Sequence, residues 1–294
     1  MQISLGMAKI DMKYGINSKK KIINNKRLSE IFLFLKKKKI KSLDISPLYG
    51  NLINRIKKFD LKKLDITYKI YVDKKNFSKI KIHDQVTSDL LILNLRKFDT
   101  ILIHNAHEIN KKKLNKTISI IEELKKVGLV KKIGLSIYTK KEYQKVSNKK
   151  KIDVIQIPLN IFDQRLLQDN WLSKESKKRN IEIQVRSVFL QGLLLCDIKK
   201  FKKNFLKKNP IIKKWNNLCN NQLNNKLMNT INFIKNQKYI KKIIIGFEDL
   251  NQLKESYKTI KNSPKKIDYS NFSSKSLNLI DPRKWNRDKI LINK

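Results

Sequence analysis

The chain has 294 residues, and 40% of them are hydrophobic, which is enough for one sizeable core. No apolar run is long enough to cross a bilayer, and the N-terminus lacks the basic and apolar regions of a secretory signal. These features exclude an integral membrane protein and predict a cytoplasmic location.

The formal net charge of +43 could indicate binding to nucleic acid, since basic side chains neutralise phosphates. The basic residues are overwhelmingly lysine and occur as short runs along the whole chain, such as 36–39 and 149–151. Proteins that read phosphates and bases usually include arginine as well, because its guanidinium makes bidentate contacts. We therefore interpret the lysines as a solvated surface and expect no specific nucleic-acid partner. Polyanion binding is kept as an alternative.

The cysteines and histidines do not form a recognisable metal site. Cys196 and Cys219 have no metal-ligand or redox spacing, and we expect both to be buried in a reducing compartment. His104 and His107 form an HxxH pair, but in a strand-to-loop segment this spacing does not place both on one face. His83 has no partner in the sequence, so we expect it to be exposed and expect no metal.

Short strand-like runs alternate with longer helical segments along the chain. The expected strands are Ile3–Ala8, Ser42–Ser46, Asp65–Ile70, Thr100–His104, Lys132–Ser136, Val154–Pro158, Ile181–Ser187 and Ile243–Phe247. The expected helices include Leu28–Lys38, Leu114–Val127, Lys140–Ser147 and Leu250–Ile260.

Eight such units without a linker predict an α/β protein, a single-domain (β/α)8 TIM barrel over residues 1–294. A doubly wound open sheet gives the same alternation, but the number of units favours the barrel. The seven glycines form no GxGxxG or Walker loop. Residues 196–239 are expected to form an extended helical crossover, and the tail at 270–294 to cross one end of the barrel.

Four titratable residues lie at or just beyond the carboxyl ends of successive expected strands: Asp44, Tyr49, Lys69 and His104. In a parallel barrel these ends meet at one mouth, where such barrels place their active sites. A phenol near an ammonium, with a carboxylate to hold the ammonium and an imidazole to donate a hydrogen bond, suits protonation of a carbonyl oxygen.

Each of these residues alone has a simpler explanation. Lysine is common throughout this chain, a histidine at a strand end is often structural, and Asp44 could cap a helix or a loop. Their order on consecutive strands is what favours catalysis.

The sequence resembles the aldo/keto reductases, and it is most similar to bacterial members. The matching segments are LGxAxxxMKYGI (5–16), LDISPLYGN (43–51), ITYK (66–69), DTILIHN (99–105), GLVKKIGLSIYT (128–139), DVIQIPLNIFDQR (153–165), VRSVFLQGLLL (185–195) and IIIGFEDLNQLKE (243–255). The resemblance implies a (β/α)8 barrel that binds NADPH in extended form across its mouth, without a Rossmann motif.

The family's catalytic set matches the same four residues. By this resemblance Tyr49 is the general acid, Lys69 lowers its pKa, Asp44 holds Lys69, and His104 orients the substrate carbonyl. The implied reaction is reduction of a small-molecule carbonyl by hydride transfer from the nicotinamide, and likeness to members of carbohydrate pathways suggests a sugar-like substrate.

The resemblance also implies cofactor contacts along the mouth. Ser136 and Gln156 would bind the nicotinamide carboxamide, although Ile137 replaces an asparagine that many members have. Arg186 stands where many members stack an aromatic ring on the nicotinamide, and a guanidinium plane can also stack. The pyrophosphate loop would contain Ser187, Leu190, Gln191 and Gly192.

The adenosine end departs furthest from the family's pattern. Gly246, Gln252 and Ser256 occupy positions where the family often has residues that bind the 2′-phosphate. Glu248 and Asp249 lie beside them and would repel that phosphate, so NADH is possible in place of NADPH. Asp11 stands where a small residue is common.

These features predict an NAD(P)H-dependent carbonyl reductase that is a monomer or small homo-oligomer. The altered cofactor positions leave one alternative, a barrel retained as a binding or regulatory subunit with weak or no turnover.

Overall fold

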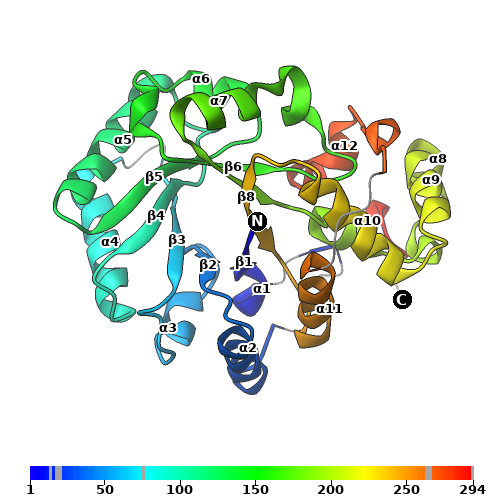
Figure 1. Cartoon of the computed structure of the whole chain (residues 1–294), viewed down its shortest axis with the longest axis horizontal. Coiled ribbons are helices and arrows are strands. Elements are labelled where there is room, and N and C mark those ends of the chain that lie inside the picture. Colours follow the sequence, from blue (N-terminus) through cyan, green and yellow to red (C-terminus); the bar gives the residue numbers. More distant parts are fainter. Residues whose placement is uncertain (13–14, 17–21, 74–76, 262–266, 293–294) are drawn as a thin grey trace.

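The computed structural model describes residues 1–12, 15–16, 22–73, 77–261 and 267–292. Its eight parallel strands form a closed barrel in chain order, so that β1 pairs with both β2 and β8 (Figure 1). The strands are β1 (Gln2–Gly6), β2 (Ser42–Ile45), β3 (Asp65–Ile70), β4 (Phe98–Ile103), β5 (Val130–Ser136), β6 (Val154–Pro158), β7 (Glu182–Arg186) and β8 (Ile240–Ile245). The predicted fold is confirmed.

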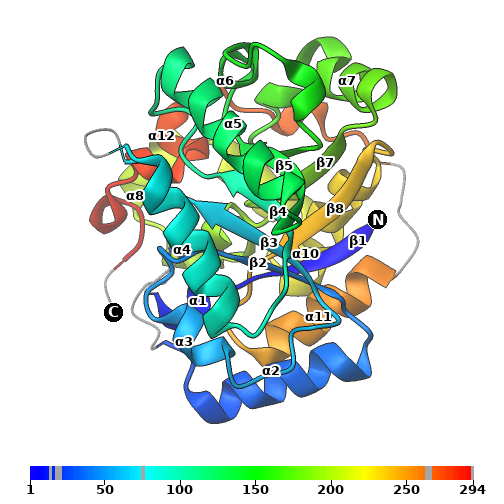
Figure 2. The same ribbon diagram turned by 90° about the vertical axis from the view of Figure 1, so that its left-hand side faces the viewer.

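Helices cover the outside of the barrel (Figures 1 and 2). The longer ones are α2 (Asn25–Lys37), α4 (Lys79–Ile92), α5 (Lys111–Lys126), α7 (Trp171–Arg179), α9 (Ile211–Leu218), α10 (Leu223–Lys235) and α11 (Leu250–Lys261). The shorter ones are α1 (Ala8–Asp11), α3 (Leu52–Ile56), α6 (Lys140–Gln144), α8 (Lys203–Lys208) and α12 (Leu277–Ile280). No described helix is both long and apolar enough to span a membrane.

Local sequence explains where several of these helices start. The side chains of Asn24, Ser78 and Asn110 accept hydrogen bonds from backbone N–H groups in the first turns of α2, α4 and α5. Helix α4 was not among the predicted helices. It buries only about one apolar side chain per turn, at Ile82, Val86 and Leu90, which gives a weak periodic signal.

Six strands start or end at other residues than predicted, and only β3 and β6 have the predicted bounds. Strand β1 ends at Gly6 because α1 begins at Ala8, and β4 ends one residue before His104. Strand β8 begins at Ile240 and ends at Ile245, so Gly246 lies in the loop that follows. Residues near the mouth that were predicted to end these three strands therefore lie in loops or, in the case of Ala8, in α1.

Side chains alternate along the strands, so that the apolar core residues face one way and the polar residues of the site face the other. Leu43 and Ile45 flank Asp44, and Tyr68 and Ile70 flank Lys69; all four apolar neighbours are buried. Successive side chains of a strand point to opposite faces. The apolar side chains therefore pack against the helices, while Asp44 and Lys69 point into the barrel.

The barrel interior holds a connected polar network. Gln156 Nε2 on β6 donates across the barrel to Asp44 Oδ2 (2.8 Å) and to Gln184 Oε1 (3.1 Å). Gln184 Nε2 donates in turn to Glu182 Oε1 (2.9 Å). Glu182 also forms ion pairs, through Oε2 with Lys132 (2.8 Å) and through Oε1 with Lys242 (3.7 Å). Burial opposes ionisation of Glu182, but the hydrogen bond from Lys132 and the charge of Lys242 outweigh it and lower the pKa.

The two segments predicted to depart from the strand–helix repeat are residues 196–239 and the tail at 270–294. Between β7 and β8 the chain forms α8, α9 and α10, with a short turn at Asn209–Pro210. In the tail, Ser274 N donates to Phe162 O (2.9 Å), and Leu291 pairs antiparallel with Phe201. Since Phe162 follows β6 and Phe201 follows β7, the tail crosses the carboxyl end of the barrel. Residues 13 and 14 of the first matching segment, and 293 and 294 of the tail, lie outside the described residues.

Candidate active site

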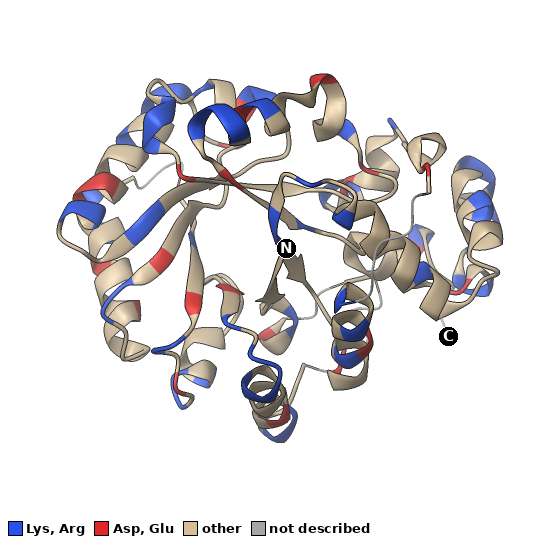
Figure 3. Cartoon of the chain, viewed as in Figure 1, with Lys and Arg blue, Asp and Glu red and all other residues tan. Residues whose placement is uncertain are grey.

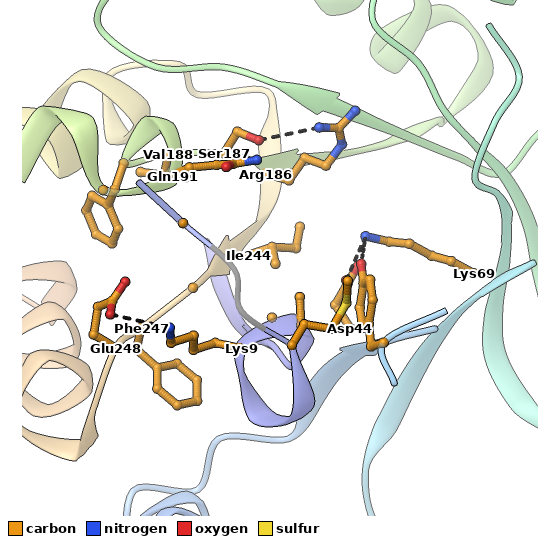
Figure 4. A pocket seen from close by; sticks show the side chains of 18 of the residues that line it. Lys9, Asp44, Lys69, Arg186, Ser187, Val188, Gln191, Ile244, Phe247 and Glu248 are labelled. Atoms are coloured by element: carbon orange, nitrogen blue, oxygen red, sulfur yellow. Dashed lines mark hydrogen bonds and ion pairs between the residues drawn. The ribbon is translucent and has the colours of Figure 1, made fainter. Parts of the chain in front are cut away.

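A pocket of about 540 Å³ opens at the carboxyl ends of the strands (Figure 4). The four residues predicted to be catalytic all line it: Asp44, Tyr49, Lys69 and His104. From them the pocket extends to Gly246 and Gln252, beyond β8. The order of the strands around the barrel thus brings together residues that are far apart in sequence.

Lys69 lies between a carboxylate and a phenol. Its Nζ is 2.7 Å from Asp44 Oδ1, and both side chains are almost fully buried. The same Nζ donates a hydrogen bond to Tyr49 Oη at 3.3 Å. Because the ammonium occupies a lone pair of the phenol oxygen, the phenolic proton is free to point into the pocket.

The phenol of Tyr49 is held in its protonated form. Burial, and then the negative charge of Asp44, raise the pKa of Tyr49 well above its ordinary value, while Arg186 acts against this rise. The sequence predicted a pKa lowered by Lys69. The structure differs because the Lys69 charge is largely neutralised by Asp44. A protonated phenol can give a proton, as a general acid must.

His104 directly follows β4 and lies beside Tyr49. Its ring meets the Tyr49 ring edge-on, with 6.3 Å between centroids. Burial, followed by the charges of Lys69 and Arg186, lowers the pKa of His104 to about 3. The imidazole is therefore neutral near pH 7 and carries one N–H that can be donated to a ligand.

The loop that contains Tyr49 is held in place by contacts with Asp11. Asn51 N donates to Asp11 Oδ2 (2.5 Å), and Arg55 pairs with Asp11 Oδ1 (2.8 Å) while also donating to Ile10 O. Gly50 has φ +65°, and a Cβ there would lie 2.6 Å from Asp11 Oδ2. The unexpected Asp11 thus ties the segment after β1 to the Tyr49 loop.

The two predicted carboxamide contacts lie beneath the pocket and do not line it. Ser136 Oγ accepts a hydrogen bond from Arg186 Nε (3.2 Å). Gln156 is fully buried and holds Asp44 through its Nε2, while its Oε1 has no hydrogen-bond partner among the described residues. A buried amide oxygen without a partner is costly, so it is suited to accept a donor from a ligand.

The predicted pyrophosphate loop follows β7 and is unusually shaped. Ser187, Leu190 and Gln191 have positive φ angles of 58°, 46° and 52°, and Gly192 has 91°. Left-handed non-glycine residues cost about 1 kcal/mol each and tend to persist at functional sites. Ser187, Gln191 and Gly192 line the pocket, whereas Leu190 is packed in the core.

At the predicted adenosine end, the side chains are hydrogen-bonded to neighbouring groups of the protein. Asp249 Oδ1 accepts from Gln252 N (2.9 Å) at the start of α11, and Gln252 Oε1 accepts from Glu248 N (2.6 Å). Glu248 also forms an ion pair with Lys9 at 3.7 Å (Figure 4). Gly246 and Gln252 line the pocket as predicted, but Ser256 is buried and donates to Gln252 O.

Arg186 lines the pocket, and its guanidinium stacks on the ring of Tyr138. Its guanidinium lies 4.4 Å from the centre of the Tyr138 ring, and Arg283 from the tail lies 3.4 Å from the same centre. The sequence singled out Arg186 for stacking on the nicotinamide, but in this structure one of its faces is on Tyr138. Arg186 and Tyr138 both line the pocket.

Sequence reasoning missed Lys9 and Tyr138 as pocket residues. Both follow a strand end by a few residues, which is the only signal that could have found them. The expected exposure of His83 is confirmed, and Cys196 and Cys219 are buried free thiols. Within the described part of the chain, no three or more His, Cys, Asp or Glu residues are grouped to hold a metal ion.

Comparison with known proteins points to one family. The model of the Aldo/keto reductase family matches residues 3–275. The fold is similar to an aldo-keto reductase from Bacillus halodurans in its holo form, with TM-score 0.68, 18% identity, and 90% of this chain and 88% of that chain covered. It is also similar to a glycerol dehydrogenase from Gluconobacter oxydans, with TM-score 0.62, 15% identity, and coverage of 90% and 87%. No match was found among curated protein sequences.

Proposed function

Because the chain belongs to the aldo/keto reductase family of oxidoreductases, we propose that it reduces an aldehyde or ketone to an alcohol with Tyr49 as the proton donor. One observation carries this proposal: Lys69, paired with Asp44, donates to Tyr49 Oη at the floor of the mouth pocket. A scaffold that only binds has no need for a buried ion pair aimed at a phenol, because such a pair is costly to bury.

The pocket and the buried amide beneath it fit a nicotinamide cofactor. The unpartnered Oε1 of Gln156 beneath the pocket suits a carboxamide N–H donor, and the backbone of the 187–192 loop suits phosphate oxygens. Gly246 and Gln252 continue the same pocket towards α11. When bound, the cofactor supplies the hydride to the carbonyl carbon.

The chain's own residues orient the carbonyl and transfer the proton to its oxygen. Neutral His104 donates a hydrogen bond to the carbonyl oxygen and orients it. As negative charge develops on that oxygen, Tyr49 transfers its proton to it, and the resulting phenolate is stabilised by the ammonium of Lys69. Asp44 keeps this ammonium charged and in place, and a proton from solvent restores the phenol.

We further propose that the cofactor is NADPH, with NADH as the alternative because Glu248 and Asp249 would repel a 2′-phosphate. The substrate we propose is a small polar carbonyl compound; one structural neighbour is named for activity on glycerol, a small polyol. We also propose a cytoplasmic monomer or small homo-oligomer that has no specific nucleic-acid partner. Figure 3 supports a solvated basic surface, since lysines and arginines are spread over helices all round the barrel.

The test starts with cofactor binding. Purified protein is titrated into NADH and NADPH while the fluorescence of the reduced nicotinamide is followed, and short aldehydes are then added. We expect the fluorescence to change on binding and absorbance of the reduced cofactor to fall on addition of an aldehyde. The proposal would be overturned if the protein bound neither reduced cofactor.

A further inference from the structure

The charged side chains of the pocket are paired, with one exception. Five charged residues line the pocket: Lys9, Asp44, Lys69, Arg186 and Glu248. Asp44 pairs with Lys69 at 2.7 Å, and Glu248 with Lys9 at 3.7 Å. Arg186 has no carboxylate within ion-pair distance among the described residues; its partners are the hydroxyls of Ser136 (3.2 Å) and Ser187 (3.4 Å).

The guanidinium of Arg186 is held in place before any ligand arrives. One face stacks on Tyr138, and its Nε and one Nη donate to the two serine hydroxyls. These bonds use two of its five N–H donors. A fixed guanidinium fork is the arrangement that proteins use to bind carboxylate and phosphate oxygens, often through two parallel hydrogen bonds.

Arg186 also lies close to where the carbonyl would react. Its positive charge acts on both Tyr49 and His104. In the view of Figure 4 its side chain is on the side of the pocket where Asp44 and Lys69 meet. A group bound to Arg186 would therefore be part of a small molecule whose carbonyl reaches Tyr49, or of a cofactor beside it.

We propose that Arg186 binds an anionic group of the substrate itself, so that the enzyme reduces carbonyl compounds that carry a carboxylate or a phosphate ester. This inference rests on the proposed function and adds the substrate class. The positive charge is half-buried and lacks a counter-ion in the protein, and an anionic substrate supplies one. A neutral substrate leaves this charge uncompensated as it displaces water from the pocket, which is unfavourable.

The experiment compares matched aldehydes that differ in charge. Succinic semialdehyde is paired with butanal, and glycolaldehyde phosphate with glycolaldehyde. The wild type, Arg186→Gln and Arg186→Lys are assayed for kcat/KM with each. Arg96→Gln is the matched control, because Arg96 is exposed just before β4, at the opposite end of the barrel.

We expect the wild type to prefer at least one anionic aldehyde over its neutral partner, and this preference to fall as ionic strength rises. Arg186→Gln should reduce the ratio of the two kcat/KM values by about 10- to 100-fold, the usual range for a hydrogen bond to a charged group. Arg186→Lys should retain part of the preference, and Arg96→Gln all of it. The two pairs of aldehydes distinguish a carboxylate from a phosphate.

Two results would overturn the inference while leaving the proposed function intact. One is that the wild type reduces neutral aldehydes at least as well as anionic ones. This result does not depend on whether any variant folds. The other is an Arg186→Gln variant that weakens NADH binding and slows all four aldehydes equally, since Arg186 would then serve the cofactor. If the wild type reduced none of the four aldehydes and bound no cofactor, the proposed function itself would fail.

Discussion

Lys69 Nζ lies 2.7 Å from Asp44 Oδ1 inside the barrel, and the two side chains are 3% and 2% exposed. The ion pair joins the neighbouring strands β2 and β3. The other carboxylate oxygen of Asp44, Oδ2, accepts a hydrogen bond from Gln156 across the barrel. The position of the ammonium under Tyr49 is thus fixed from two sides.

Breaking this pair should harm both stability and turnover. Asp44→Asn leaves the buried ammonium without a counter-ion, and we expect it to lower the free energy of unfolding by about 3 kcal/mol. We expect kcat to fall by about 10- to 100-fold, because Lys69 would no longer be held under Tyr49. Urea unfolding and steady-state kinetics measure the two effects.

The control for this variant is an exposed ion pair. Lys79 and Glu123 pair on the surface with side chains 58% and 53% exposed. Glu123→Gln should change the free energy of unfolding by less than about 1 kcal/mol. Equal effects of Asp44→Asn and Glu123→Gln would show that the buried pair is not the structural element described above.

The pH dependence of stability should contain a contribution from His104. Burial chiefly, and then Lys69, lower its pKa from 6.5 to about 3 in the folded chain. Between these pH values the unfolded chain binds more protons, so the folded state loses stability as the pH falls. His104→Gln should therefore flatten the plot of unfolding free energy against pH in this window.

His83→Gln is the matched control for that measurement, since the His83 side chain is 49% exposed. Its plot should follow that of the wild type. If His104→Gln left the slope unchanged, His104 would not be the neutral imidazole that the mechanism uses.

Cofactor preference should respond to one carboxylate near α11. Asp249→Ser removes a negative charge but keeps a side-chain oxygen that can cap the helix at Gln252 N. We expect this variant to improve the affinity for NADPH relative to NADH by about 3- to 10-fold, because one repulsive charge is lost. Fluorescence titration with both cofactors gives the ratio. A ratio identical to that of the wild type would argue against phosphate repulsion at this position.

The sequence was sufficient to predict the barrel because period-two alternation and the spacing of eight units are local properties. It also placed Asp44, Tyr49, Lys69 and His104 at one mouth, since parallel strands bring their carboxyl ends together. The raised pKa of Tyr49 could not be predicted, because it depends on burial and on the neutralisation of Lys69 by Asp44.

Contacts between distant segments were likewise beyond sequence reasoning. Tyr138 is covered by Arg186 from β7 and by Arg283 from the tail, and nothing near Tyr138 in the sequence indicates either contact. Ser136 and Leu190 lie in the segments predicted to bind the cofactor, yet side-chain packing directs both away from the pocket surface. Sequence patterns locate a segment; the packing decides which of its side chains are accessible.

The most direct test of the central claim is a single-turnover measurement on Tyr49→Phe. Protein saturated with reduced cofactor is mixed with an aldehyde, and oxidation of the bound nicotinamide is followed by stopped flow. We predict that Tyr49→Phe binds the cofactor as the wild type does but reacts about 10²- to 10⁴-fold more slowly, because the proton donor is missing. Oxidation at the wild-type rate by a folded Tyr49→Phe protein would contradict the assignment of Tyr49 as the proton donor.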